Sequence, residues 1–138
     1  MKAATAMPTQ VTRSKVLIVD DSRTNLFIVE AILKSQYETH LANSGPEALQ
    51  FIQSGPSPDL ILLDIMMPGM DGYQVCSSLK SDPVTTTIPI IFLTGQTELE
   101  EEVKGFQLGA VDYITKPVCP STLLARVHTH LENARLFE

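Results

Sequence analysis

The sequence predicts a single α/β domain in which helices cover both faces of a parallel β-sheet. Short, β-branched apolar runs recur along the 138-residue chain and end in polar residues, which is typical of strands buried on both faces. Segments with apolar residues at helical spacing lie between these runs, and such alternation favours right-handed parallel crossovers. We therefore predict a (βα)5 flavodoxin-like, doubly wound sheet with strand order 2-1-3-4-5.

The first half of the chain begins this alternation at residue 16. The expected elements are a strand at 16–19, a helix at 24–35, a more polar strand at 38–42, a helix at 46–53 and a strand at 60–63. The polar strand suits a sheet edge. Ser44 and Glu47 form a Ser-x-x-Glu capping pattern around Pro46, which marks a helix start.

The second half continues the same pattern. It holds a helix around Val75, Cys76 and Leu79, a strand at 90–93, a helix opened by a Thr-x-x-Glu box at 97–100, a strand at 111–114 and a helix from 121 to about 136. Gly109 is expected to end the fourth helix. Leu131 and Phe137 stay in phase on the last helix, so we expect the natural chain to continue beyond Glu138.

Composition and charge exclude several classes of protein. Hydrophobic residues make up 43% and charged residues 19% of the chain, which indicates a folded domain rather than a disordered one. The net charge is −6 with ten Lys and Arg residues, which argues against direct nucleic-acid binding. The apolar runs are too short to cross a bilayer, so no membrane association is expected.

One domain is expected at 15–138, after a flexible tail at 1–14. The tail lacks the apolar segment of a signal peptide, and Cys76 and Cys119 do not form a disulfide framework. Both observations favour a reducing cytoplasm. We interpret Cys76 as a buried packing residue and Cys119 as an inert helix cap or packing residue.

Reactive side chains directly follow four of the predicted strands. They are Asp20, Asp21, Asp64, Thr94 and Lys116. In open α/β sheets the functional site lies outside the carboxyl ends of the strands, so these groups should converge. Only the polar edge strand contributes no obvious reactive group.

This set of residues predicts a metal-assisted phosphoryl site. Three converging carboxylates repel one another unless a cation neutralises them, and hard oxygen ligands favour Mg²⁺. Lys116 and Thr94 would then surround an anion bound at a carboxylate, and we expect this anion to be a phosphoryl group. A carboxylate can itself act as the nucleophile toward phosphorus. No histidine is placed for proton transfer: His40 lies in the edge strand, and His128 and His130 lie in the last helix.

Each of these residues also has an ordinary structural explanation. Acidic pairs such as Asp20 and Asp21 commonly cap helices, and Thr94 or Lys116 alone would be a strand-end hydroxyl or a surface amine. Tyr113 alone is more often a core aromatic residue. Their joint placement at successive strand ends makes the functional interpretation the stronger one.

Four segments carry a family resemblance: Val-Leu-Ile-Val-Asp-Asp at 16–21, Leu-Leu-Asp-Ile-Met-Met-Pro-Gly-Met-Asp-Gly at 62–72, Phe-Leu-Thr-Gly at 92–95 and Asp-Tyr-Ile-Thr-Lys-Pro at 112–117. In this order, over about residues 15 to 136, they closely resemble the receiver domain of two-component response regulators, the CheY-like superfamily. The resemblance implies that Asp64 accepts a phosphoryl group from a histidine kinase or a histidine phosphotransfer protein. It also implies that the domain is not an enzyme toward other substrates: it catalyses only its own phosphorylation and dephosphorylation.

The same resemblance assigns the remaining roles at the site. Asp21, Asp64 and the backbone carbonyl of Met66 would bind Mg²⁺, for which Mn²⁺ could substitute, while Asp20 acts through water. Lys116, joined to Pro117 by a cis peptide, would pair with the acyl phosphate. Thr94 would bind a phosphoryl oxygen, and Tyr113 would turn inward as the switch moves.

Further implications concern variable positions and partners. Met66 and Gln96 occupy positions whose side chains tune dephosphorylation in this family, and Cys119 stands where an Asp often caps the last helix. The face formed by the fourth helix, the last strand and the last helix could support a homodimer. The end of the chain resembles receivers joined by a continuing helix to an output domain such as a diguanylate cyclase or a cyclic-di-GMP phosphodiesterase.

Three other classes of protein fit the sequence less well. A haloacid-dehalogenase-like phosphatase would need a second Asp at position 66, which is Met. A flavodoxin-like cofactor carrier would need a Ser-, Thr- and Gly-rich first loop, whereas Asp20 and Asp21 would repel a phosphate. A degenerate receiver acting only as a scaffold would lack some of the acidic, hydroxyl or lysine positions, and all of them are filled.

Overall fold

The computed structural model describes residues 13–95 and 99–136, and within this part of the chain five strands form one parallel sheet. The strands are β2 (Lys15–Val19), β3 (Glu38–Ala42), β4 (Leu60–Asp64), β5 (Ile90–Thr94) and β6 (Asp112–Thr115). The helices are α1 (Arg23–Leu33), α2 (Gly45–Ser54), α3 (Gly72–Lys80), α4 (Leu99–Gln107) and α5 (Pro120–Leu136). The strand order β3-β2-β4-β5-β6 is 2-1-3-4-5 in chain order, so the predicted fold is confirmed.

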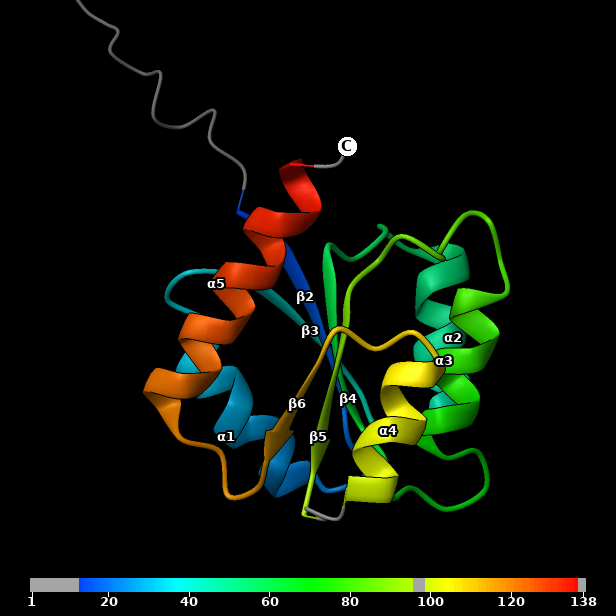
Figure 1. The fold of residues 1–138 in the computed structure, drawn as a ribbon. Coiled ribbons are helices and arrows are strands. Elements are labelled where there is room, and N and C mark those ends of the chain that lie inside the picture. The colour runs from blue at the N-terminus through cyan, green and yellow to red at the C-terminus, as the bar shows by residue number, and fades with distance from the viewer. Residues whose placement is uncertain (1–12, 96–98, 137–138) are drawn as a thin grey trace, which may run out of the picture.

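Helices cover both faces of the sheet, as its apolar strands require. α1 and α5 lie on one face and α2, α3 and α4 on the other (Figure 1). Successive residues of the central strands alternate between two cores: Leu17, Leu63 and Phe92 face α2 and α3, whereas Ile18 and Leu62 face α1 and α5. The strand at 38–42 lies at an edge of the sheet, as its polarity predicted.

Side-chain caps begin the helices that lead away from the strand ends. Ser44 Oγ accepts from Glu47 N at 3.1 Å, as the capping pattern predicted, whereas Glu47 Oε1 accepts from the N–H of Asn43 at 2.6 Å rather than from that of Ser44. α1 begins at Arg23, with Ser22 as its cap, one residue before the predicted start. A capping box of Asp71 and Gln74, which the sequence analysis did not identify, begins α3.

The end of the fourth helix and the start of the last strand are also defined. Gly109 follows α4 with φ of +108°, a conformation that glycine adopts readily, as expected of a helix stop. β6 begins at Asp112 rather than at Val111, which is exposed. The first two residues of the predicted Thr-x-x-Glu box, 97 and 98, lie outside the described residues. Residues 1–12 of the predicted tail also lie outside them.

The two cysteines differ in burial, and both are free thiols. Cys76 is fully buried on α3, as predicted, whereas Cys119 is exposed before α5. Across the described ranges, no helix combines the length and the apolar character needed to cross a membrane.

Gly72 packs so closely on the segment after β4 that we expect it to tolerate no side chain. A Cβ added there would lie 2.8 Å from Ile65 Cα and would overlap the backbone carbonyl of Asp64. We predict that Gly72→Ala lowers the free energy of unfolding by about 1–3 kcal/mol, because the backbone must shift to admit the methyl group. Urea denaturation followed by far-UV circular dichroism would measure this change.

Gly95→Ala is the matched control, because a Cβ at Gly95 meets no atom within 4 Å. We expect its unfolding free energy to change by less than about 0.5 kcal/mol. Equal stability of the two variants would contradict the close packing of Gly72.

Candidate functional site

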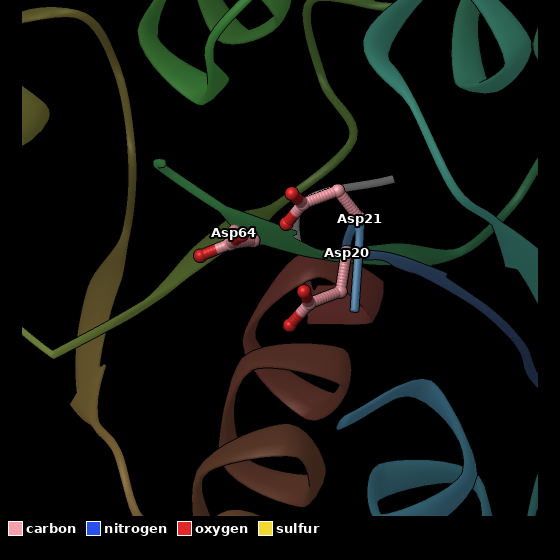
Figure 2. A group of neighbouring side chains, drawn as sticks. All are labelled: Asp20, Asp21 and Asp64. Atoms are coloured by element: carbon pink, nitrogen blue, oxygen red, sulfur yellow. The ribbon is translucent and has the colours of Figure 1, made fainter. Parts of the chain in front are cut away.

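Three aspartates meet at the carboxyl ends of the two central strands β2 and β4. Asp20 and Asp21 directly follow β2, and Asp64 is the last residue of β4. Because Val19 lies opposite Leu63 in the sheet, these strand ends are side by side. Each aspartate offers a carboxylate oxygen within 4.8 Å of the others, and Figure 2 shows the three carboxylates together. The predicted convergence of these residues is therefore confirmed.

Burial differs within this acidic cluster. Asp20 is 1% and Asp64 3% exposed, whereas Asp21 lies at the surface. Asp20 Oδ1 accepts from Ser22 N at 2.9 Å, which holds the Asp20 side chain at the turn into α1. A buried carboxylate needs compensating partners, so two buried carboxylates this close indicate a site built around positive charge.

Lys116 supplies one such charge. Its Nζ lies 3.0 Å from Asp20 Oδ2 and 2.9 Å from Asp64 Oδ1. The residue follows β6, where its backbone N–H donates to the carbonyl of Thr94 at 2.8 Å, and a cis peptide joins it to Pro117, as predicted. The last strand and its neighbour β5 thus fix the Lys116 backbone beside the carboxylates.

The cluster carries more negative than positive charge, and the pKa of Asp64 reflects this. Burial is the largest cause that raises this pKa; the hydrogen bond from Lys116 opposes it, and the charges of Asp20 and Asp21 add to it, so that the pKa rises to about 6. Burial alone would lower the pKa of Lys116, but its bonds to Asp64 and Asp20 raise it. One ammonium group therefore leaves the three carboxylates only partly compensated.

The donor set fits a metal ion. Asp20, Asp21 and Asp64 offer hard carboxylate oxygens, and one of the three residues is open to solvent. A divalent cation would supply the positive charge that Lys116 alone does not. These residues could accordingly hold such an ion between β2 and β4.

Thr94 ends β5 beside this cluster. It is 1% exposed and lines a cavity of about 520 Å³ that the β4–α3 segment and α4 also border. Met66, which is 64% exposed, and Lys104 lie on the rim of the same cavity. The structure therefore brings Thr94 to the carboxyl edge of the sheet as predicted, whereas Gln96 lies outside the described residues.

Tyr113 lies on β6 and is half-buried. Its hydroxyl is 3.1 Å from that of Tyr73 on α3, and its ring packs on Phe92 and Phe106. The sequence analysis missed Tyr73 and Lys104, which carry no motif and meet the site only through tertiary contacts. The helix-capping box at Asp71 and Gln74 did carry a signal, the Asp-x-x-Gln spacing.

Other candidate residues lie outside the cluster. Cys119 precedes α5, where its carbonyl accepts from Leu123 N at 2.9 Å, as a cap does. Hydrogen bonds from Ser121 and Thr122 lower the pKa of its exposed thiol to about 7. His40 pairs with Glu38 on β3 and His130 with Asp112, so neither ring faces the acidic cluster.

Comparison with known proteins gives a consistent result. Residues 16–128 match the family described as the response regulator receiver domain. The chain is 49% identical over 120 residues to a probable cyclic di-GMP phosphodiesterase of Vibrio cholerae, and 42% identical over 117 residues to response regulator PleD of Caulobacter vibrioides. These matches cover 87% and 84% of the chain but only 27% and 26% of the two relatives.

A solved structure agrees with these matches. The crystal structure of a putative response regulator from Chloroflexus aurantiacus superposes with a TM-score of 0.83 at 39% identity, covering 88% of this chain and 99% of the other. The chain thus spans about a quarter of the curated relatives and nearly all of a solved receiver-sized chain. It belongs to the response regulator receiver domains, the family that accepts phosphoryl groups in two-component signalling.

Proposed function

We propose that Asp64 accepts a phosphoryl group from a histidine kinase or histidine phosphotransfer protein, and that the phosphorylated form switches an output domain or partner. The observation that carries this proposal is the position of the Asp64 carboxylate between two other carboxylates and the Lys116 ammonium. This arrangement combines a nucleophile with groups that neutralise charge on a phosphoryl group. An ionised carboxylate needs no general base to attack phosphorus.

The covalent step is a transfer between two residues. An Asp64 carboxylate oxygen forms a bond to phosphorus while the bond from phosphorus to the donor imidazole nitrogen breaks, and the departing imidazole takes up a proton. The product is an acyl phosphate on Asp64. Lys116, already 2.9 Å from this carboxylate, pairs with the added negative charge, and the Thr94 hydroxyl donates to a phosphoryl oxygen.

Mg²⁺ is the proposed cofactor, with Mn²⁺ as a substitute, and it would neutralise the phosphoryl oxygens as they approach the carboxylates. Asp21, Asp64 and the Met66 carbonyl are its proposed ligands, with Asp20 acting through water. The acidity and burial of the cluster support this assignment. The domain itself catalyses only its own phosphorylation and dephosphorylation.

The face formed by α4, β6 and α5 is the proposed output surface. Val103, Phe106 and Val111 are exposed apolar side chains on or beside these elements, which supports contact with a second copy or an output domain. Because the Vibrio cholerae and Caulobacter vibrioides relatives are about four times as long as the matched region, we propose a cytoplasmic protein in which the receiver at 15–138 precedes an output domain. Turnover of cyclic di-GMP is the output that the Vibrio cholerae relative supports.

Replacing the acceptor should abolish phosphorylation. We predict that acetyl phosphate adds one phosphoryl group to the protein only when Mg²⁺ is present, and that Asp64→Asn takes up none, because the amide is a poor nucleophile. Intact-mass spectrometry before and after alkaline treatment would detect the base-labile adduct.

The matched control is Asp59→Asn, an exposed aspartate just before the opposite end of β4. This variant should be phosphorylated like the wild type. Phosphorylation of Asp64→Asn to the wild-type extent would place the acceptor elsewhere, and wild-type protein that accepts no group from acetyl phosphate or from a phosphohistidine donor would refute the proposal.

Removing Lys116 should destabilise the metal-free protein. Lys116→Ala leaves the buried Asp20 and Asp64 without their shared counter-charge, so we expect a loss of about 1–3 kcal/mol in unfolding free energy at neutral pH. Millimolar Mg²⁺ should recover more stability in this variant than in the wild type, because it binds only the folded cluster. Urea titrations with and without Mg²⁺ would measure both effects.

Lys34→Ala, at an exposed position after α1, is the control and should behave like the wild type in both titrations. A Lys116→Ala protein that is as stable as the wild type without Mg²⁺ would show that the ion pair does not compensate the buried carboxylates.

A further inference from the structure

Two tyrosine hydroxyls meet across the core on the α3 and α4 side of the sheet. Tyr73 on α3 and Tyr113 on β6 lie 40 residues apart in sequence, and their hydroxyl oxygens are 3.1 Å apart. Tyr73 is 7% exposed, whereas Tyr113 is half-buried. Either hydroxyl can donate to the other, so the pair satisfies a polar atom that Tyr73 carries into the protein interior.

Neighbouring side chains hold this pair in place. The Tyr73 ring packs edge-on against Phe92 at 5.4 Å between centroids, and the Tyr113 ring packs on Phe92 at 5.6 Å. Lys104 Nζ lies 4.4 Å from the centroid of the Tyr73 ring, a cation–π contact. A Cβ at Gly105 would lie 2.6 Å from Tyr113 Cε2, so α4 packs directly on the Tyr113 ring.

Each tyrosine is joined through its own chain segment to one side of the phosphoryl site. Tyr73 follows Gly72, whose N–H donates to the Ile65 carbonyl at 2.9 Å and whose Cα packs against the Asp64 carbonyl. Tyr113 precedes Lys116 by three residues, on the strand that pairs with β5 and Thr94. The hydroxyl pair therefore links the segment that carries the acceptor to the segment that carries its counter-charge.

Rotation of Tyr113 away from the core would break this link. Its hydroxyl would exchange Tyr73 for solvent, and the hydroxyl of the largely buried Tyr73 would lose this contact. A buried polar group that loses a partner carries an unfavourable desolvation cost, so the pair favours the inward orientation. The resulting bias acts on the equilibrium between two orientations rather than on the chemical step.

We propose that Tyr73 is a positioning residue for the receiver reaction, whose hydroxyl holds Tyr113 inward and so biases the domain toward the form that retains the phosphoryl group. This inference rests on the proposed function and extends it to a residue that does not contact the carboxylate cluster. Tyr73 acts on Tyr113 through the contact of their hydroxyls, so removing either hydroxyl removes this interaction.

The test is a double-mutant cycle read out by beryllofluoride binding, with this anion standing in for the phosphoryl group in the presence of Mg²⁺. Tyr73→Phe and Tyr113→Phe should each weaken binding by about two- to tenfold, the range expected for one hydrogen bond. The loss in the double variant should be smaller than the sum of the two single losses, because both substitutions remove the same interaction. Additive losses, or an unchanged affinity in Tyr73→Phe, would overturn the inference.

Tyr37→Phe is the matched control. It is the third of the three tyrosines, and it is buried in the core on the opposite side of the sheet, with α1 and α5. Its beryllofluoride affinity should equal that of the wild type even if its unfolding free energy falls as much as that of Tyr73→Phe. A matching loss of affinity in Tyr37→Phe would show that the effect is only one of stability.

A spectroscopic signature separates positioning from general loosening. In protein labelled with 3-fluorotyrosine, the ¹⁹F resonance of Tyr113 should move toward that of a solvent-exposed tyrosine in Tyr73→Phe and return when beryllofluoride saturates the site. A Tyr113 resonance that is the same in the wild type and in Tyr73→Phe would overturn this inference but not the proposed function. Wild-type protein that binds no beryllofluoride and accepts no phosphoryl group would overturn the proposed function and this inference with it.

Discussion

The contact of one ammonium group with two buried carboxylates fixes the geometry on which the rest of the site depends. Lys116 Nζ bonds both Asp20 and Asp64, and the first of these pairs joins residues 96 positions apart. Two buried carboxylates this close repel each other and need compensation, which Lys116 supplies to both. Lys116, which follows β6, therefore pairs with Asp20, which follows β2, and with Asp64, which ends β4. The charge that remains uncompensated is what a divalent cation would satisfy.

Buried polar side chains are concentrated at this site, and the rest of the described core is almost entirely apolar. Among the described residues, the buried polar side chains are Asp20, Asp64, Thr94 and Thr85. Thr85 is satisfied locally by donating to the Leu79 carbonyl at 2.6 Å, whereas the other three meet at the carboxyl edge of the sheet. Because β2 lies between β3 and β4, strands distant in sequence end together at this edge. Burial together with this shared position thus distinguishes these three residues from the other polar residues that the structure describes.

The sequence was sufficient to predict the strands, their order and the residues that end them, because doubly buried parallel strands are short apolar runs with a sharp polar boundary. It could not predict the contacts between side chains on different elements. The pairing of Tyr73 with Tyr113 and the position of Lys104 over the Tyr73 ring depend on how α3 and α4 lie on β5 and β6. Local patterns determine neither. The start of β6 was also not predicted: the strand begins at Asp112, although the Val111 N–H already donates to the Ile90 carbonyl of β5 at 2.9 Å.

The last strand joins the site to the last helix through a second set of ionic contacts. Asp112, at the start of β6, accepts from Arg126 Nη1 at 2.7 Å and contacts His130 Nε2 at 2.8 Å, both on α5. Burial raises the pKa of Asp112, but its bonds to His130, to the Tyr113 N–H and to Arg126 outweigh burial and lower it, so the carboxylate stays ionised and held by α5. The short strand β6 and the residue after it therefore hold three linked residues: Asp112, which contacts α5, Tyr113 of the hydroxyl pair, and Lys116 of the site. In the proposed mechanism, added charge at Asp64 pulls on Lys116. Because Asp112 ties the start of β6 to α5, a shift of that strand in the proposed mechanism would be transmitted to α5.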